Sequence, residues 1–196
     1  MELRGDRLTL RSPAADDARR LWEIHCEPSV ERWWGPHTLA EVEQEVADAA
    51  KPPTGEDSVP FVIEVDGETA GMIQYADVGD EDFRHAAIDL FLAEGFQGRG
   101  LGRESIEVLI RHLTADRGHH RLIIDPAVAN ERAVRCYEAV GFRSEGILRE
   151  EAYREGRRID MIRMGLLRGE LALPSRREGA GGRKPGTGRR KRSRAR

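Results

Sequence analysis

The sequence has few cysteines and no long apolar segment. Its 196 residues include two cysteines, Cys26 and Cys136, which are too few for a disulfide framework and lack the spacing of a zinc site. No apolar run approaches the roughly 20 residues that a membrane helix needs, and residues 1–7 lack the apolar region of a secretory signal. We therefore expect a cytoplasmic protein with no membrane partner and no metal.

The composition is typical of one soluble domain with a charged appendage. Hydrophobic residues make up 39% of the chain and charged residues 34%, which excludes a collagen or a wholly disordered protein. Residues 176–196 contain ten Lys or Arg and one Glu, a balance of +9, whereas residues 1–175 contain 22 basic and 34 acidic residues, a balance of −12. We predict a folded domain at 1–173 and a disordered tail at 174–196. The acidic body would attract cations, and the tail would make weak contact with nucleic acid.

Apolar periodicity predicts a mixed α/β (α+β) fold. Alternating apolar residues indicate strands, and apolar residues three or four apart indicate helices. The pattern predicts a sheet of about seven strands flanked by about four helices. The expected strands are 6–11, 61–65, 69–78, 86–93, 121–125, 142–149 and 157–166, and the expected helices begin at Pro13, Thr38, Gly102 and Asn130.

A glycine-rich loop separates an apolar strand from the start of a helix. Without Cβ atoms, its backbone N–H groups can approach an anion, and the helix N-terminus adds a partial positive charge. The spacing differs from that of a P-loop or a dinucleotide fingerprint. The loop is either a simple turn or the site of a phosphate-bearing ligand, and its residues are Gln97, Gly98, Arg99, Gly100, Leu101 and Gly102.

A second motif follows a strand about twenty residues after the helix of that loop. It consists of Asn130, Ala133, Tyr137 and the pair Gly141-Phe142. Together the two motifs resemble the GNAT superfamily of N-acetyltransferases, over residues 6–167. The resemblance implies a splayed central sheet and a glycine loop that holds the pyrophosphate of acetyl-CoA.

The same resemblance places acetyl-pantetheine between the strands at 86–93 and 121–125. It would lie beside Phe91, Leu92 and Ala93. Asn130 and Ala133 would line the coenzyme, and Tyr137 would face its sulfur.

Other segments resemble aminoglycoside 6′-N-acetyltransferases. They are Trp33-Trp34-Gly35, residues 38–42, residues 70–75 with Tyr75, Ile88-Asp89, Asp125-Pro126 and residues 132–138. The resemblance implies that Asp89 and Asp125 hold or deprotonate the substrate amine. Trp33, Trp34 and Tyr75 would contact the substrate, and Glu155 would lie near a further acidic contact. Enzymes that acylate lysine-like siderophore precursors share several of these segments.

Two aspartates interrupt apolar strands, which is independent evidence for a site. Asp89 lies within 86–92 and Asp125 ends 122–125. An amine attacks a thioester only when neutral, so a nearby carboxylate can accept its proton. The alternatives are aspartates that face solvent, or an Asp125 that caps a helix. Tyr137 would donate a proton to the leaving thiolate, or is simply a core aromatic.

Three further features leave alternatives open. Trp33 and Trp34 either pack in the core or stack on a sugar ring. Backbone N–H groups near Phe91 and Ala93 would stabilise an oxyanion if that strand bulges. Cys136 is about a third of a turn from Tyr137, so we expect a packed thiol that faces elsewhere.

These observations predict an acetyl-CoA-dependent N-acetyltransferase that acts directly on a primary amine of a small polycation, with an aminoglycoside preferred. The alternatives within this class are a lysine-like siderophore precursor, a polyamine or a peptide amine. An alternative of another class is an idle acetyl-CoA-binding module with a nucleic-acid-binding tail. A monomer and a homodimer both remain open.

Overall fold

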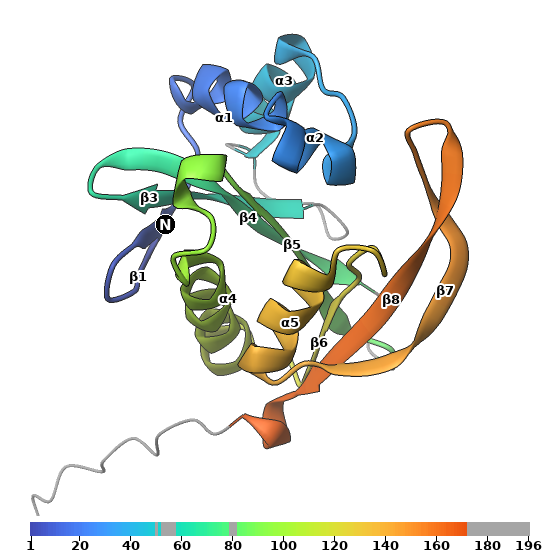
Figure 1. The fold of residues 1–196 in the computed structure, drawn as a ribbon. Coiled ribbons are helices and arrows are strands. Elements are labelled where there is room, and N and C mark those ends of the chain that lie inside the picture. The colour runs from blue at the N-terminus through green and yellow to red at the C-terminus, as the bar shows by residue number, and fades with distance from the viewer. Residues whose placement is uncertain (50, 52–57, 79–81, 172–196) are drawn as a thin grey trace, which may run out of the picture.

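The computed structural model describes residues 1–49, 51, 58–78 and 82–171 and contains one eight-stranded sheet with helices on both faces (Figure 1). The strands are β1 (Glu2–Arg4), β2 (Thr9–Arg11), β3 (Ser58–Val65), β4 (Glu68–Val78), β5 (His85–Leu92), β6 (Arg121–Ile124), β7 (Arg143–Arg154) and β8 (Arg157–Leu167). The helices are α1 (Asp17–His25), α2 (Pro28–Trp34), α3 (Leu39–Ala49), α4 (Leu101–Arg111) and α5 (Glu131–Val140). The tail expected at 174–196 lies outside the described residues.

The sheet opens in its middle. Its order is β1-β2-β3-β4-β5-β6-β8-β7, and β5–β6 is the parallel pair. These two strands pair at Ala86–Leu122 and Ala87–Ile123, and beyond these residues they diverge. The residues of β5 after Ala87 therefore have no strand beside them on the β6 side, and we call this gap the β5–β6 opening. The mixed, splayed sheet confirms the expected fold class.

Two helical layers cover opposite faces of the sheet. Helices α4 and α5 pack against a core that includes Ile88 and Ile124. Helices α1 to α3 pack against Val62, Met72 and Phe91 on the other face (Figure 1). Successive strand residues point to opposite faces, so Asp89, which lies between Ile88 and Leu90, shares its face with Phe91.

Three local signals in the sequence form as expected. Asp66 and Gly67 have φ of 52° and 82° in the tight turn between β3 and β4. Thr38 and Glu41 exchange the hydrogen bonds of a capping box at the start of α3. The Asn130 side chain accepts a hydrogen bond from the Ala133 N–H at 3.3 Å and caps α5.

The N-terminal region differs from the expectation. Strand β1 and helix α2 are additional, which gives eight strands and five α-helices in the described part of the chain. Helix α1 begins at Asp17 and not at Pro13. The Asp17 carboxylate accepts hydrogen bonds from the Arg11 guanidinium at 2.7 and 2.8 Å and from the Ala14 N–H at 2.8 Å. These contacts hold the turn at residues 14–17 that leads into the helix, where the Asp17 N–H also donates to the Ala14 carbonyl at 2.9 Å.

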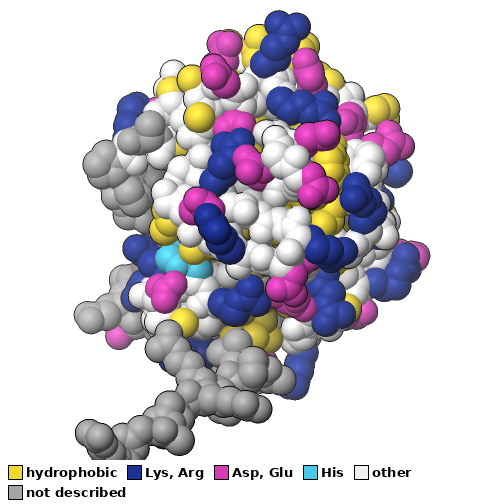
Figure 2. Space-filling view, turned by 90° about the vertical axis from the view of Figure 1, so that its left-hand side faces the viewer, with side chains coloured by type: hydrophobic (Ala, Val, Ile, Leu, Met, Phe, Trp, Pro, Cys, Tyr) yellow, Lys and Arg dark blue, Asp and Glu magenta, His cyan; other side chains and the backbone are white. Residues whose placement is uncertain are grey.

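The surface carries both signs of charge on the same face. Figure 2 shows acidic and basic side chains interspersed over the side of the molecule that carries β1 and β3. The excess of acidic residues in the body therefore does not form a field of one sign on this side. Among the described residues, no helix is both long and apolar enough to cross a membrane.

Candidate active site

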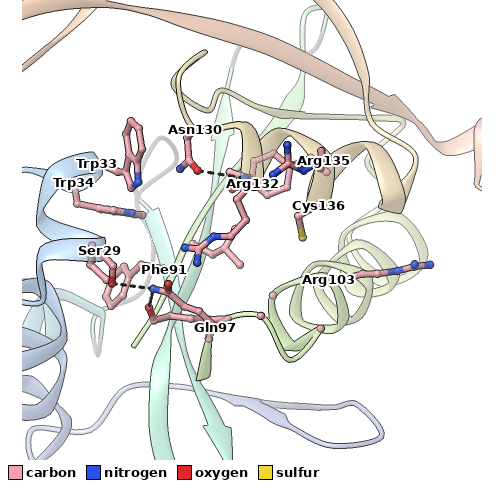
Figure 3. A pocket seen from close by; sticks show the side chains of 18 residues that line it. Ser29, Trp33, Trp34, Phe91, Gln97, Arg103, Asn130, Arg132, Arg135 and Cys136 are labelled. Atoms are coloured by element: carbon pink, nitrogen blue, oxygen red, sulfur yellow. Dashed lines mark hydrogen bonds between the residues drawn. The ribbon is translucent and has the colours of Figure 1, made fainter. Parts of the chain in front are cut away.

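A cavity of about 390 Å³ lies between α2, β5, the glycine loop and the helices α4 and α5 (Figure 3). It is continuous with the β5–β6 opening, because Leu90, Phe91 and Leu92 line it. Residues predicted from the sequence form most of its wall. These are Trp33, Trp34, Phe91, Leu92, Gln97, Gly98, Gly100, Gly102, Asn130, Ala133 and Tyr137.

The glycine loop has the backbone conformation that an anion site needs. Gly98 and Gly100 have φ of 72° and 78°, which residues with a Cβ rarely adopt. Gln97 fixes the loop, because its Nε2 donates hydrogen bonds to the Leu92 carbonyl at 2.7 Å and to Ser29 Oγ at 3.3 Å. The unpaired N–H groups of the first turn of α4 follow directly, so the loop can hold phosphate oxygens.

Three of the residues expected at the coenzyme have side chains outside this cavity. The Leu101 side chain is 2% exposed in the main core. Ala93 is buried, and its N–H donates to the Ala70 carbonyl at 2.8 Å. Arg99 lies over the Phe96 ring. Leu101 and Ala93 can therefore offer a coenzyme only backbone atoms, and the Ala93 N–H is already used. The Arg99 side chain is exposed, and its contact with a coenzyme stays a prediction.

Three arginines on α4 and α5 were not expected and line the cavity, and one of them has an uncompensated charge. Arg103 pairs with Glu107 at 2.8 Å and Arg135 with Glu131 at 3.0 Å. Arg132 has no ion-pair partner within the described part of the chain, and its side chain extends into the space between α2 and α5 (Figure 3). This charge suits the phosphates of a coenzyme.

Strand β5 offers unused backbone donors to the opening without a bulge. The β4–β5 register runs without a shift from Gly71–Leu92 to Val78–His85. Since Ala93 pairs with Ala70, the alternation of an antiparallel ladder directs the N–H groups of Leu90 and Leu92 away from β4. The splay of the sheet, and not a bulge, therefore frees these donors for an oxyanion.

Asp89 stands beside the opening with an altered acidity. Its side chain is accessible to water, yet protein atoms surround it closely. Partial desolvation, with the Asp125 carboxylate as a second cause, raises the pKa of Asp89 from 3.8 to about 6. A carboxylate with this pKa is ionised at neutral pH and is a stronger base than an ordinary aspartate.

Asp125 occupies a different electrostatic environment. Arg163 of β8 binds it in a fork, with Nη2 at 2.6 Å from Oδ2 and Nε at 3.1 Å from Oδ1. The negative charge of Asp125 is thus largely compensated within the protein. The structure brings the two predicted acids to one face of the sheet but leaves only Asp89 without a basic partner among the described residues.

Tyr137 and Cys136 both line the cavity from α5. Tyr137 is 8% exposed, and burial together with Asp89 raises the pKa of its phenol, which stays protonated at neutral pH. Its hydroxyl has no hydrogen-bond partner among the described side chains and backbone. The expectation that Cys136 faces elsewhere was wrong, because the wide cavity spans two successive positions of the helix. Burial raises the pKa of this thiol.

The two tryptophans both line the cavity but have different surroundings. Trp34 packs edge-to-face on Phe91, with ring centroids 5.1 Å apart. Trp33 is half-buried, and the Arg32 guanidinium lies 4.5 Å from its ring centroid. The Trp33 carbonyl accepts a hydrogen bond of 2.8 Å from Arg154, so the tip of the β7–β8 hairpin closes against α2. Glu155, in that tip, lines a neighbouring hollow of about 420 Å³ with Trp33.

Tyr75 is not at the site, and this expectation was wrong. It pairs with Ile88 across β4–β5 and is 2% exposed. Its ring packs near Phe61 and His112 in the core under α4. A shift of one residue along a strand reverses the face, so Gln74 and not Tyr75 lies beside Asp89.

Of the site residues that the sequence analysis missed, some had a detectable sequence signal and others had none. Arg103 and Arg132 lie in the first turns of the helices that follow the two motifs, which is a detectable signal for anion binding. Ser29 reaches Gln97 across 68 residues, and Arg163 reaches Asp125 across 38. No local pattern identifies such partners. Within the described ranges, no group of three His, Cys, Asp or Glu side chains could hold a metal ion.

The chain is similar to several acetyltransferases. A family profile described as "Acetyltransferase (GNAT) domain" matches residues 7–143. Aminoglycoside N(6′)-acetyltransferase type 1 of Klebsiella pneumoniae is 30% identical over 155 residues, 72% of this chain and 76% of the relative. Spermidine N(1)-acetyltransferase of Escherichia coli is 26% identical over 156 residues, 79% and 83% of the two chains.

Solved structures extend the similarity. A crystal structure of spermidine N-acetyltransferase from Vibrio cholerae, in complex with CoA and spermine, has a TM-score of 0.74 and 25% identity. It covers 84% of this chain and 97% of the other. With the family profile across residues 7–143 and these relatives, the chain belongs to the GNAT acetyltransferase family and is an acyltransferase.

Proposed function

We propose that the protein transfers an acetyl group from acetyl-CoA directly to a primary amine of a small polycation, with the 6′-amine of an aminoglycoside as the preferred acceptor and antibiotic resistance as the result. The observation that carries this proposal is the Asp89 carboxylate, which lies beside the β5–β6 opening without a basic partner among the described residues. The 30% identity to an aminoglycoside N(6′)-acetyltransferase supports the choice of acceptor.

The coenzyme would bind on the basic side of the opening. The glycine loop and the first turn of α4 would hold the pyrophosphate, and Arg132 would contact a phosphate. The pantetheine would lie along Leu90 and Leu92, whose free N–H groups face the opening. This arrangement leaves the thioester close to Asp89 and Tyr137.

The transfer then requires proton transfers at two side chains, Asp89 and Tyr137. Asp89, directly or through water, takes one proton from the substrate ammonium, and the neutral amine attacks the carbonyl carbon of the thioester. The N–H groups of Leu90 and Leu92 would stabilise the tetrahedral oxyanion. When the C–S bond breaks, Tyr137 would donate its hydroxyl proton to the thiolate and regain one, directly or through water, from the nitrogen that becomes the amide. CoA would then leave as the thiol, and the proton held by Asp89 would pass to solvent. The products are an amide and CoA.

A polyamine is the second candidate acceptor. Spermidine N(1)-acetyltransferases are among the curated relatives, and a similar structure contains spermine. A lysine-like siderophore precursor and a peptide amine belong to the same chemical class. The Asp125–Arg163 pair removes one of the two negative charges expected at the acceptor, which reduces the advantage of a highly charged aminoglycoside over spermidine.

A thiol-release assay across kanamycin, spermidine, lysine and a short peptide tests the proposal. We expect acetyl-CoA to be consumed fastest with kanamycin, and mass spectrometry should show one acetyl group on the 6′-amine. Faster turnover of spermidine than of kanamycin would show that a polyamine is the preferred acceptor. No thiol release with any amine would favour the idle acetyl-CoA-binding module.

We place the enzyme in the cytoplasm, as a monomer or homodimer, with residues 1–173 as the catalytic domain. The basic segment 174–196, outside the described residues, would supply a weak contact with nucleic acid. Its deletion should leave kcat unchanged and abolish salt-sensitive retention on immobilised DNA.

A further inference from the structure

A second cavity, separate from the coenzyme cavity, lies between α1, α3 and the strands β3 and β4. It has a volume of about 540 Å³ and shares no lining residue with the first. Its floor is apolar and buried, with Leu21, Val46 and Met72 each no more than 6% exposed. We call it the α3 cavity, and it is large enough for part of a small organic molecule.

The α3 cavity begins one strand away from the candidate base. Gln74 of β4 lines it, and Gln74 stands directly opposite Asp89 in the β4–β5 ladder. In a hydrogen-bonded antiparallel pair the two Cα atoms are about 5.5 Å apart, and the side chains leave the sheet on the same face. A molecule whose amine reaches Asp89 can therefore extend over Gln74 into the α3 cavity.

A buried imidazole contributes an unused polar group to the wall. His25 is 2% exposed, and its Nδ1 has no hydrogen-bond partner among the described residues. Burial lowers the pKa of His25 to about 4, with the nearby His37 as a second cause, so the ring is neutral at pH 7. A neutral imidazole offers one acceptor nitrogen, which matches a ligand N–H or O–H.

The carboxylates at the rim are not equivalent. Asp48 accepts hydrogen bonds from Lys51 at 2.5 Å and from Gln44 at 2.9 Å, so its charge is compensated. Glu45 has no ion-pair partner among the described side chains. It lies on the same face of α3 as Val42, Val46 and Ala49, which also line the cavity. The rim therefore carries one uncompensated negative charge above an apolar floor.

We propose that the α3 cavity binds the far end of the acceptor, and that the acceptor class is an amine with a second ammonium group separated from the first by an apolar chain or ring. This inference rests on the proposed acetyl transfer. The apolar segment packs on Leu21 and Met72, the second ammonium group pairs with Glu45, and the first reaches Asp89. The cavity thus selects diamines, polyamines and amino sugars over monoamines.

Steady-state kinetics of Glu45→Gln with spermidine and n-butylamine test the proposal. We expect the KM for spermidine to rise about tenfold, because a charge-assisted contact is lost, while kcat changes less than twofold. The KM for n-butylamine should not change. Glu43→Gln is the matched control, since Glu43 is exposed on α3 and does not line the cavity. Equal KM values for spermidine in the two variants would overturn the proposal.

A second variant tests the volume of the cavity and not its charge. Ala49→Phe places a large side chain at the end of α3, where Ala49 is half-buried and outside the apolar core cluster. We expect it to raise the KM for spermidine and leave that for n-butylamine unchanged, with the Tm of the variant confirming the fold. An unchanged KM for spermidine in the folded variant would contradict occupancy of the cavity.

A binding measurement can test the α3 cavity even if the protein does not transfer an acetyl group. If no amine releases thiol, the acetyl transfer fails, and spermidine can still be titrated calorimetrically into the full-length protein. Weaker binding to Glu45→Gln than to Glu43→Gln would then support the α3 cavity as the ammonium site. Equal affinities would overturn it.

Discussion

The two sides of the β5–β6 opening are built by different means. On the α4–α5 side, contiguous segments supply the glycine loop, two helix N-termini and Arg132, which has no ion-pair partner among the described residues. On the other face, Asp89 and Gln74 come from β5 and β4 and Asp125 follows β6, and the charge of each aspartate depends on which partner it meets. A coenzyme with many phosphates can be held by local backbone geometry, whereas a variable acceptor requires side chains assembled across the sheet.

Asp89 and Asp125 illustrate the difference most clearly. In the sequence they are equivalent, since each interrupts an apolar strand. In the fold, Arg163 neutralises Asp125, whereas Asp89 meets no basic side chain among the described residues and has a negative charge nearby. In the proposed mechanism Asp89 is therefore the candidate base, and Asp125 would position the acceptor and raise the pKa of Asp89.

The largest effect should come from Asp89→Asn, which removes the base at constant shape. We expect kcat/KM to fall about 10²–10⁴-fold, as for other general bases. Asp125→Asn should cost less, because its charge is already compensated by Arg163. Thiol-release kinetics measure both variants. A larger loss for Asp125→Asn would reverse the assignment of base and positioning residue.

The pKa of Asp89 adds a dependence on pH. The carboxylate must be ionised to accept a proton, so kcat/KM should rise with pH through about 6 and then level off. The folded-state pKa lies above the unfolded value of about 3.9, so this group stabilises the fold below about pH 4 and loses that contribution as pH rises through about 6.

Asp89→Asn should therefore raise the Tm at pH 7.5 and leave it unchanged at pH 4. Solvent access to the carboxylate limits the gain to about 1 kcal/mol, or about 2–4 °C. A lower Tm of the variant at pH 7.5 would show that the ionised Asp89 carboxylate stabilises the folded state, which would contradict its raised pKa.

Tyr137→Phe should have the next largest effect. It removes one hydrogen bond to a developing thiolate, so we expect kcat to fall about 10–100-fold with little change in the KM for the amine. Tyr75→Phe is the control within the same protein, since Tyr75 lies in the core. Stopped-flow thiol release measures kcat for both. Equal losses would show that the tyrosines act through packing alone.

Gly100→Val tests the coenzyme side. At φ of 78° a β-branched residue is strained, and its Cβ would lie 3.3 Å from Arg7 Nη2. We expect at least tenfold weaker binding of CoA in calorimetric titration. Gly95→Val is the control, because nothing lies within 4 Å of the added Cβ there. Unchanged affinity for CoA in a folded Gly100→Val variant would contradict the proposal that the glycine loop holds the pyrophosphate.

Arg132→Gln should give the smallest change. One arginine–phosphate contact would be lost, and we expect about fivefold weaker binding of CoA at low salt and a smaller difference at 0.5 M salt. Arg111→Gln, exposed at the end of α4, controls for the change in net charge. Identical affinities for the two variants would show that Arg132 does not contact the coenzyme.

Prediction from the sequence was most successful where the determinants are local. Asn130 caps α5, Thr38 caps α3 and Asp66-Gly67 turns between β3 and β4, because each needs only residues within about four positions. The glycine loop is of the same kind. Tyr75 was misplaced because apolar residues fill both faces of β4, so alternation alone did not indicate which face bears the site.

The sequence by itself determined the order of the central elements, the glycine loop, the capped start of α5 and the presence of two strand aspartates. Only the tertiary structure decided that Arg163 pairs with Asp125, that Gln74 stands beside Asp89 and that α3 leaves a cavity next to them. The reason is physical. Backbone conformation and caps depend on near neighbours, whereas the charge and accessibility of a side chain depend on whatever the fold places within a few ångströms of it.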